Sequence, residues 1–292
     1  MRLKKSKQNL RFCGLEEKFS SWNNSRIVIL PVAYDLTTSY KSGTIDGPKA
    51  IIDASRYMEA YDEETEKEVS KLGIHTAGEI RSSELQPEDV IKKVEKKTSL
   101  ILDAGKFPVI IGGEHSITLG PVLSCRKKFG NFSVLQLDAH SDMRDVFQGW
   151  KHSHGCIAKR ITEITDVVQI GIRSLSKEEA EKGHKNLKTF FMKDMVRSQR
   201  WAEEAIGSLK EKKVYVTIDM DVFDPSIMPS VGTPEPGGMG WYETLLLLKR
   251  LSREKEIIGF DAVELAPIHG NVSPDFLAAK LVYKFLNYIF VK

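Results

Sequence analysis

The sequence is poor in the features that mark secreted and membrane-spanning proteins. It has only three cysteines in 292 residues, Cys13, Cys125 and Cys156. This odd, widely spaced set predicts neither a disulfide framework nor a zinc motif and suits a reducing compartment. No apolar run approaches the roughly 20 residues of a spanning helix, and the N-terminus lacks the apolar stretch of a signal peptide. We therefore expect a cytoplasmic protein that has no membrane partner.

The sequence also lacks a large excess of positive or negative charge. The formal net charge is only +3, from 43 Lys and Arg against 40 Asp and Glu, which is too small to predict a nucleic-acid partner. One basic cluster, interpreted as a solvated tail, consists of Arg2, Lys4, Lys5, Lys7 and Arg11. The length and the ordinary apolar and charged fractions predict a globular protein that buries a sizeable core.

Short apolar runs alternate with helical patterns along the whole chain. The predicted strands are 26–33, 72–77, 107–111, 132–137, 167–172, 189–192, 214–218 and 257–264. The predicted helices are 48–61, 86–104, 116–128, 155–165, 177–185, 200–211, 241–252 and 273–289. The alternation has no linker and no internal repeat. It predicts one α/β domain, 1–292, with a mostly parallel central sheet flanked by helices.

Two aspartates and a histidine follow the buried strand 132–137. They are Asp138, His140 and Asp142, in the sequence LQLDAHSD. If the chain stays extended there, alternate residues share one face, so the three side chains lie close together. Such a group is costly to bury unless a cation neutralises it. The spacing therefore predicts a metal site.

Three other predicted strands also lead into ionisable residues. His115 follows strand 107–111, Asp219 and Asp221 follow strand 214–218, and Glu264 stands at the end of strand 257–264. In parallel sheets, sites lie beyond the carboxyl ends of the strands. We therefore expect these residues to meet the first group at one edge of the sheet.

The charge of this set predicts two metal ions. Without Glu264, the set contains four aspartates and two neutral imidazoles, so two divalent cations balance it, whereas one would leave two buried carboxylates uncompensated. Carboxylate and imidazole ligands without thiolate suit Mn²⁺, Fe²⁺ or Zn²⁺. Two such ions lower the pKa of a shared water toward neutrality, which predicts hydrolysis.

Five segments, in order along the chain, resemble the signature blocks of the ureohydrolases, the arginase/agmatinase family. They are GGEHSITLG, LQLDAHSDMRD, TIDMDVFDP, GTPEPGG and DAVELAP. VAYDLTTSYKSGTIDGPKAI and QIGIRSLSKEE also look like agmatinase segments. The resemblance spans nearly the whole chain. It implies a three-layer arginase-like fold, a small guanidino substrate, and a homo-oligomer that is a trimer or a hexamer.

The resemblance also implies a binuclear manganese centre with two Mn²⁺ per chain. One ion would take His115, Asp138, Asp142 and Asp219, and the other would take Asp138, His140, Asp219 and Asp221. Asp138 and Asp219 would bridge the two ions, and the hydroxide between them would attack the guanidinium carbon and release urea. The implied catalytic residues are Asp142 and His154, of which His154 would protonate the leaving amine. Glu264 would pair with the guanidinium of the substrate.

The substrate prediction rests on the loop 143–152, MRDVFQGWKH. This loop lacks the Ser-Gly-Asn-type segment with which arginases hold the α-carboxylate and amine of their substrate. It resembles the agmatinase version, so we predict agmatine as substrate, putrescine and urea as products, and Asp145 as a partner of the distal ammonium. Aminopropylagmatine, guanidinobutyrate and arginine stay open. So do a weakly active ligand-binding paralogue and a single-metal deacylase, although four aspartates argue against the deacylase.

One position departs from the family pattern. The usual P-G-x-G-T-P segment reads PSVGTP at 229–234, so Ser230 stands where a glycine is usual. If this position needs a positive φ, serine adopts it less easily than glycine. We would then expect a reshaped pocket or a slower enzyme.

Overall fold

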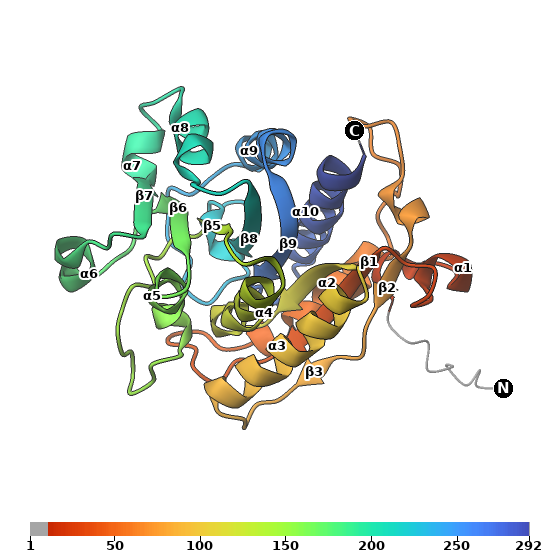
Figure 1. Cartoon of the computed structure of the whole chain (residues 1–292), viewed down its shortest axis with the longest axis horizontal. Coiled ribbons are helices and arrows are strands. Elements are labelled where there is room, and N and C mark those ends of the chain that lie inside the picture. Colours follow the sequence, from red (N-terminus) through yellow and green to blue (C-terminus); the bar gives the residue numbers. More distant parts are fainter. Residues whose placement is uncertain (1–10, 292) are drawn as a thin grey trace.

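One parallel sheet runs through the molecule (Figure 1). The computed structural model describes residues 11–291, so Arg2, Lys4, Lys5 and Lys7 of the predicted basic tail lie outside them, whereas Arg11 is described and pairs with Glu17. Within this range nine strands pair in the order β2-β1-β4-β9-β8-β5-β6-β7, with β3 also beside β1. The strands are β1 (Ile27–Ala33), β2 (Ile74–Thr76), β3 (Ile80–Arg81), β4 (Phe107–Gly112), β5 (Ser133–Leu137), β6 (Asp166–Ile172), β7 (Leu187–Phe191), β8 (Lys213–Asp219) and β9 (Glu256–Val263).

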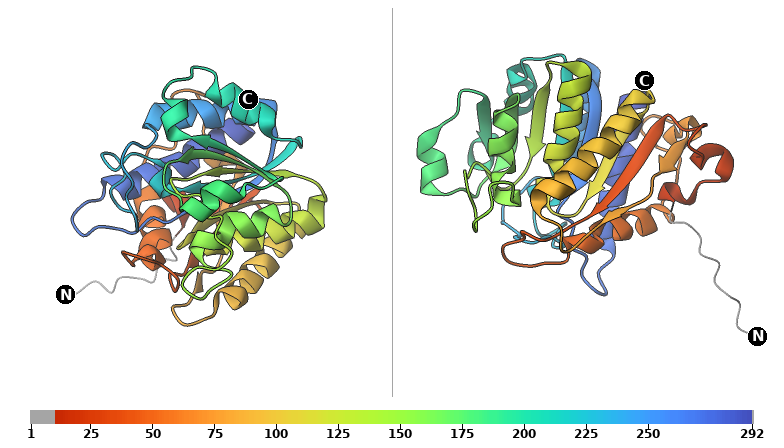
Figure 2. Two further views of the ribbon diagram at one scale, coloured as in Figure 1. Left: turned by 90° about the vertical axis from the view of Figure 1, so that its left-hand side faces the viewer. Right: turned by 60° about the horizontal axis from the view of Figure 1, so that its bottom comes forward.

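Helices cover both faces of this sheet, as the left view of Figure 2 shows. One face packs against α3 (Pro87–Asp103), α4 (Leu119–Phe129) and α5 (Ile157–Thr162). The other packs against α2 (Gly47–Ser55), α7 (Met192–Met195), α8 (Trp201–Ser208), α9 (Trp241–Glu254) and α10 (Ser273–Phe290). Because both faces are covered, β1 and β5 are buried along their whole length, which explains their apolar sequences. The predicted α/β sandwich is confirmed.

Several short elements complete the described chain. They are α1 (Glu17–Ser20), α6 (Lys177–Lys182), and the 3-10 turns η1 (Phe12–Gly14), η2 (Thr44–Asp46), η3 (Val69–Leu72), η4 (His115–Thr118), η5 (His154–Cys156) and η6 (Met220–Val222). The sequence pattern missed α1, α7 and β3. It was also wrong about the helix 48–61, because α2 ends at Ser55. The chain turns away after Ser55, and the Asp62 carboxylate then accepts the N–H groups of Glu64 and Thr65 in a further turn.

The strand order places the predicted site residues side by side. β4, β9, β8 and β5 are consecutive neighbours, and their registers bring their carboxyl ends to the same edge of the sheet. His115 follows β4, Glu264 follows β9, Asp219 ends β8 and Asp138 follows β5. Residues that are far apart in the sequence therefore meet at one place.

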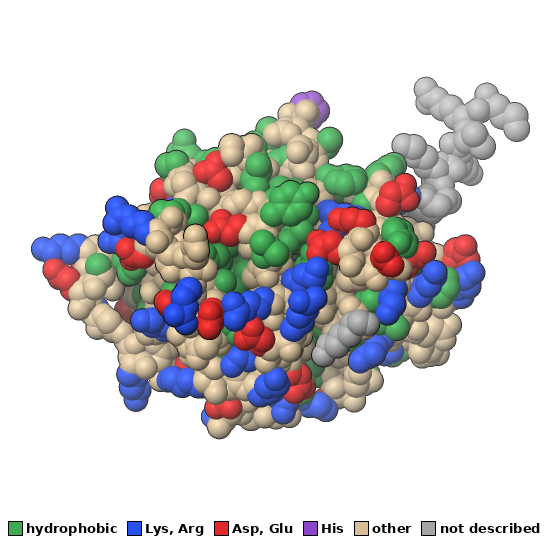
Figure 3. All heavy atoms as spheres, turned by 90° about the horizontal axis from the view of Figure 1, so that it is seen from above, with side chains coloured by type: hydrophobic (Ala, Val, Ile, Leu, Met, Phe, Trp, Pro, Cys, Tyr) green, Lys and Arg blue, Asp and Glu red, His purple; other side chains and the backbone are tan. Residues whose placement is uncertain are grey.

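The expectations about charge, membrane spans and cysteines can be compared with the described residues. On the face drawn in Figure 3, basic and acidic side chains are interspersed rather than separated. Between residues 11 and 291, no helix has both the length and the hydrophobicity that a membrane span needs. All three cysteines are free thiols, and Cys125 and Cys156 are buried.

A substitution at Gly113 tests how closely the backbone packs just before the site. A Cβ on Gly113 would lie 1.9 Å from the backbone oxygen of Tyr34. We expect Gly113→Ala to lower the free energy of unfolding by at least about 1–3 kcal/mol, because the backbone has no room to move aside. Gly78→Ala is the control, since a Cβ there meets nothing within 4 Å. Urea unfolding measures both, and equal stability of the two variants would contradict this account.

Candidate metal centre

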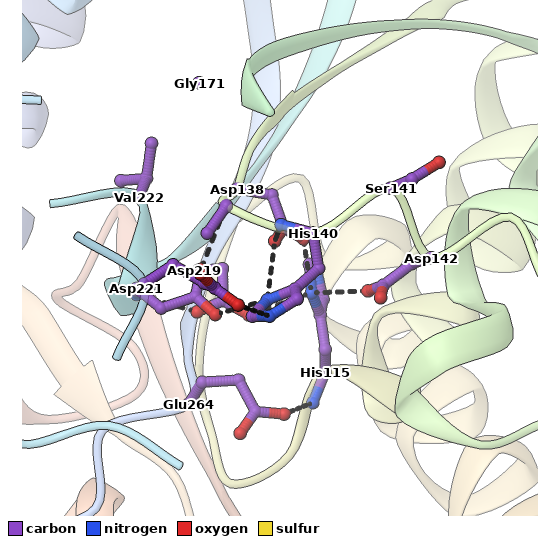
Figure 4. A network of polar contacts seen from close by, with 12 residues as sticks. His115, Asp138, His140, Ser141, Asp142, Gly171, Asp219, Asp221, Val222 and Glu264 are labelled. Carbon is purple, nitrogen blue, oxygen red and sulfur yellow. Dashed lines mark hydrogen bonds and ion pairs between the residues drawn. The ribbon is translucent and has the colours of Figure 1, made fainter. Parts of the chain in front are cut away.

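His115 places one ring nitrogen among three carboxylates (Figure 4). Its Nδ1 lies 3.2 Å from Asp138 Oδ2, 3.2 Å from Asp219 Oδ2 and 3.5 Å from Asp142 Oδ2. This nitrogen is buried and has no hydrogen-bond partner among the described residues. Separations of this size are those between ligands of one ion whose metal–ligand bonds are about 2.0–2.2 Å long.

The other nitrogen of His115 fixes the tautomer. Nε2 lies 2.8 Å from Thr217 Oγ1, and that hydroxyl donates its proton to Asp261 Oδ1 at 2.6 Å. A hydroxyl has one proton, so Nε2 of a neutral His115 must be the donor to Thr217. Nδ1 then turns a lone pair toward three carboxylates, an arrangement that requires a cation between them. The residues therefore fit a metal ion.

A second group adjoins the first and consists of Asp138, His140 and Asp221. His140 Nδ1 lies 2.8 Å from Asp221 Oδ2 and 3.8 Å from Asp138 Oδ1. Asp138 thus offers one oxygen to each group. Asp219 has Oδ2 in the first group, while its Oδ1 accepts the N–H of Asp221 at 2.8 Å. The structure brings all six predicted ligands together, and the bridging role of Asp219 stays a prediction.

Two site residues have unusual backbone conformations. The φ angle is 52° at Asp142 and 66° at Glu264, in the left-handed region that costs a non-glycine residue about 1–3 kcal/mol. The extended spacing that we expected from Asp138 to Asp142 is therefore wrong at its last residue. A left-handed turn, and not strand alternation, carries Asp142 to the site.

The side chains of the cluster carry too little positive charge for its carboxylates. Burial, followed by the charges of neighbouring carboxylates, raises the pKa of Asp142 and Asp219 well above the ordinary value. Burial and then Glu114 raise the pKa of Glu264 to about 8. Burial, the largest single effect, would lower the pKa of His140, but Asp221, Asp138 and Asp142 together outweigh it and raise that pKa to about 11. Divalent cations beside these carboxylates would supply the positive charge that the side chains lack.

Polar residues inside the buried strands support the ligands. Gln136 on β5 donates to Asp138 Oδ2 at 2.7 Å, and Thr217 and Asp261 hold His115 as described. Arg173 donates to the backbone oxygens of residues 221 and 235, at 2.7 and 2.8 Å, and so ties down the loop after β8. The sequence analysis missed these residues. For Gln136, Thr217 and Asp261 the signal was a polar side chain within an apolar run, which is costly unless it is hydrogen-bonded.

A cavity of about 320 Å³ opens onto the two groups. His154 and Glu264 line it, together with five of the six ligand candidates. Glu264 Oε1 accepts the backbone N–H of His115 at 2.6 Å. Burial, followed by the charges of His140 and His115, lowers the pKa of His154 to about 4, so that its ring is neutral near pH 7.

The prediction for Asp145 was wrong. Its carboxylate pairs with Arg160 and does not line the cavity. The loop from 143 to 153 instead contributes Arg144, whose guanidinium lies 4.4 Å from the ring centre of Phe147. Phe147 in turn meets the His154 ring edge to face at 5.6 Å.

Ser230 causes no backbone strain. Its φ is not positive, so the position does not need the glycine that is usual there. The residue is fully buried, its carbonyl accepts the N–H of Ala266 at 2.8 Å, and its hydroxyl has no hydrogen-bond partner in the described chain. The expected conformational effect on the pocket therefore has no basis in the structure.

Known proteins resemble this chain in sequence and structure. A sequence model described as the arginase family matches residues 25–287. The N(1)-aminopropylagmatine ureohydrolase of Synechocystis sp. is 42% identical over 280 residues, covering 93% of this chain and 92% of its own. The agmatinase of Pyrococcus horikoshii is 35% identical, with 88% and 89% covered. The crystal structure of agmatine ureohydrolase of Thermoplasma volcanium has a TM-score of 0.86 at 31% identity, covering 96% of this chain and 94% of that one.

Metal binding should stabilise the protein more strongly as the pH rises. The raised pKa of Glu264, about 8, means that its contribution to stability is complete below about pH 4.5 and is lost as the pH rises toward 8. The raised pKa values of Asp142 and Asp219 act in the same direction. We therefore expect the melting temperatures of Mn²⁺-loaded and chelator-treated protein to diverge between pH 5 and 8.

The control for this experiment is Asp138→Asn, which removes the carboxylate shared by the two groups. It should bind fewer than two Mn²⁺ per chain, as measured by elemental analysis, and should show a smaller gap between the two melting temperatures. A gap that is independent of pH in the unsubstituted protein would contradict the account.

Proposed function

This chain belongs to the arginase family, as a ureohydrolase, and we propose that its own substrate is N(1)-aminopropylagmatine. The proposal rests on the carboxylates of the cavity wall and on the 42% identity to a relative with that name. Agmatine, which the sequence analysis predicted, is the second candidate, because the Pyrococcus and Thermoplasma proteins are named for it. The trimer or hexamer implied by the resemblance stays a prediction.

The carboxylates of the wall favour a cationic substrate. Two divalent cations would balance the four aspartates. The charged residues that then remain in the cavity wall are three acidic ones, Glu179, Glu235 and Glu264, and two basic ones, Lys41 and Arg144. Acidic side chains thus remain in excess beside the place where a guanidinium would enter. A substrate with further positive charges gains from that excess, whereas one with a carboxylate does not.

One of these three carboxylates is already engaged. Glu179 accepts the backbone N–H groups of Met143 and Ser176 at 2.8 and 2.7 Å and lies 3.7 Å from Arg144 Nε. Its role is to hold the loop and to engage the charge of Arg144. Glu264 and Glu235 remain to face the substrate.

Glu264 and Glu235 suit the two ends of an aminoguanidine. Glu264 lies next to the metal ligands and is buried, so it suits the guanidinium, whose N–H groups match a carboxylate. The Glu235 side chain is 36% exposed and lies 3.8 Å from His140 Nε2, so it suits an ammonium of the tail. Aminopropylagmatine has two amino groups in its tail and agmatine has one, so the longer compound gains more from this wall.

We propose Mn²⁺ as the metal, because the resemblance to the ureohydrolases implies it and because carboxylate and imidazole ligands without thiolate suit it. When bound, the two ions would supply a water whose pKa is close to neutral. His154 accepts a proton at a ring nitrogen and passes it to the departing amine, since its lowered pKa leaves the ring neutral and able to accept. Glu264 orients the guanidinium for this transfer.

The proton transfer can be tested at His154 with a neighbouring histidine as control. His154→Ala should lower kcat by about 10²–10⁴-fold without loss of bound Mn²⁺. His152→Ala should keep near-normal activity, because His152 pairs with Glu88 at 2.8 Å and does not line the cavity. Equal losses of metal and activity in His154→Ala would make His154 a structural residue and not a proton carrier.

Substrate choice is tested by urea release from aminopropylagmatine, agmatine, guanidinobutyrate and arginine. We expect the first to have the highest kcat/KM and the two carboxylate-bearing compounds to be roughly 10²-fold or more poorer, since their carboxylates would find no partner in a partly dry cavity. Turnover of arginine as efficient as that of aminopropylagmatine would contradict the proposal. A preference for agmatine would favour the second candidate.

The tail contact has its own test. Glu235→Gln should raise KM for aminopropylagmatine by a few-fold to about 10-fold while kcat stays close to normal, because only a half-exposed ion pair is lost. Glu181→Gln is the control, since Glu181 pairs with Lys177 on α6 away from the cavity. An unchanged KM in Glu235→Gln would show that the ammonium binds elsewhere.

A further inference from the structure

A buried chain of hydrogen bonds leads from His154 to Glu114. Thr37 Oγ1 lies 3.3 Å from His154 Nδ1 and accepts the backbone N–H of His154 at 3.2 Å. The same hydroxyl donates to Glu114 Oε1 at 2.6 Å. Thr37 follows β1, Glu114 follows β4 and His154 begins η5, so three separate parts of the fold meet here.

The donors around Glu114 determine which groups donate and which accept in this chain of hydrogen bonds. Its carboxylate accepts Thr37 Oγ1 and Ser116 Oγ on Oε1, at 2.6 and 2.5 Å, and the backbone N–H of Thr37 on Oε2 at 2.6 Å. Three donors thus converge on its two oxygens, so both oxygens act as hydrogen-bond acceptors. Glu114 is fully buried, so these bonds are the compensation for its burial.

Proton counting then assigns the tautomer of His154. The single proton of the Thr37 hydroxyl is given to Glu114, so this hydroxyl can only accept from the ring. Nδ1 of His154 must therefore carry a proton. The ring of His154 lines the cavity, so Nε2 is the nitrogen left with a lone pair for a reacting group.

We propose that Thr37 and Glu114 are positioning residues that hold His154 in its Nδ1–H tautomer and thereby direct the Nε2 lone pair toward the substrate. The inference rests on the proposed function, in which His154 carries a proton. His115 uses the same device with the opposite nitrogen: Nε2 donates to Thr217, Thr217 donates to Asp261, and Nδ1 is left free. In this way His115 turns an unprotonated Nδ1 toward the carboxylates, and His154 turns an unprotonated Nε2 toward the cavity.

The direct test is ¹⁵N NMR of protein with labelled histidine, loaded with Zn²⁺ because Mn²⁺ is paramagnetic. His154 signals are identified by their loss in His154→Ala. We expect a protonated Nδ1 and an unprotonated Nε2 near pH 7. An Nε2–H tautomer in the unsubstituted protein would overturn the proposal without any variant being made. This measurement does not depend on turnover, so it stays distinct from a failure of the proposed function.

Variants test whether the tautomer matters for the reaction. Thr37→Val keeps the shape of the side chain but loses the hydroxyl, and we expect a mixed tautomer and a kcat roughly 10–10²-fold lower, with KM and metal content close to normal. Thr37→Ser restores a hydroxyl and should recover most of the activity. Failure of serine to rescue, or a loss of activity that follows a loss of metal, would make Thr37 merely structural.

Glu114→Gln provides a second, independent variant. An amide nitrogen facing Thr37 Oγ1 would donate to it, so that the hydroxyl proton points at His154 Nδ1 and favours the Nε2–H tautomer. We expect the NMR signals of His154 to exchange their protonation pattern and kcat to fall at least as far as in Thr37→Val. An unchanged His154 spectrum in both variants would overturn the proposal.

Discussion

Mutual repulsion among buried carboxylates is the constraint on which the rest of the site depends. Asp138, Asp142, Asp219 and Asp221 are each less than a tenth exposed and lie at the ends of two neighbouring strands. Such a group is unfavourable unless cations hold it together. The strand order, the left-handed turn at Asp142 and the single unpartnered nitrogen of His115 are all consistent with two bound cations.

A second layer of hydrogen bonds orients His115, Asp138 and His154. Threonine hydroxyls have a central part, because each has one proton to give and can accept from a histidine at the same time. Thr217 and Thr37 each stand between a histidine and a buried carboxylate. The fold thus specifies the chemical state of a side chain as well as its position.

The sequence predicted the parts of this molecule that depend on local pattern. Apolar runs followed by Asp or His located the strand ends, and the parallel arrangement implied that those ends meet. The failures have a different origin. The position of Asp142 depends on one backbone angle, and the position of the Asp145 side chain depends on an ion pair with Arg160. The chain of hydrogen bonds through Thr37 depends on contacts across 77 and 117 residues of sequence. Periodicity carries no information about such contacts.

Anomalous X-ray diffraction from crystals grown with Mn²⁺ tests the central claim most directly. The account predicts two manganese peaks per chain that share the Asp138 carboxylate, one beside His115 Nδ1 and the other beside His140 Nδ1. A single peak, or two peaks with no ligand in common, would contradict it.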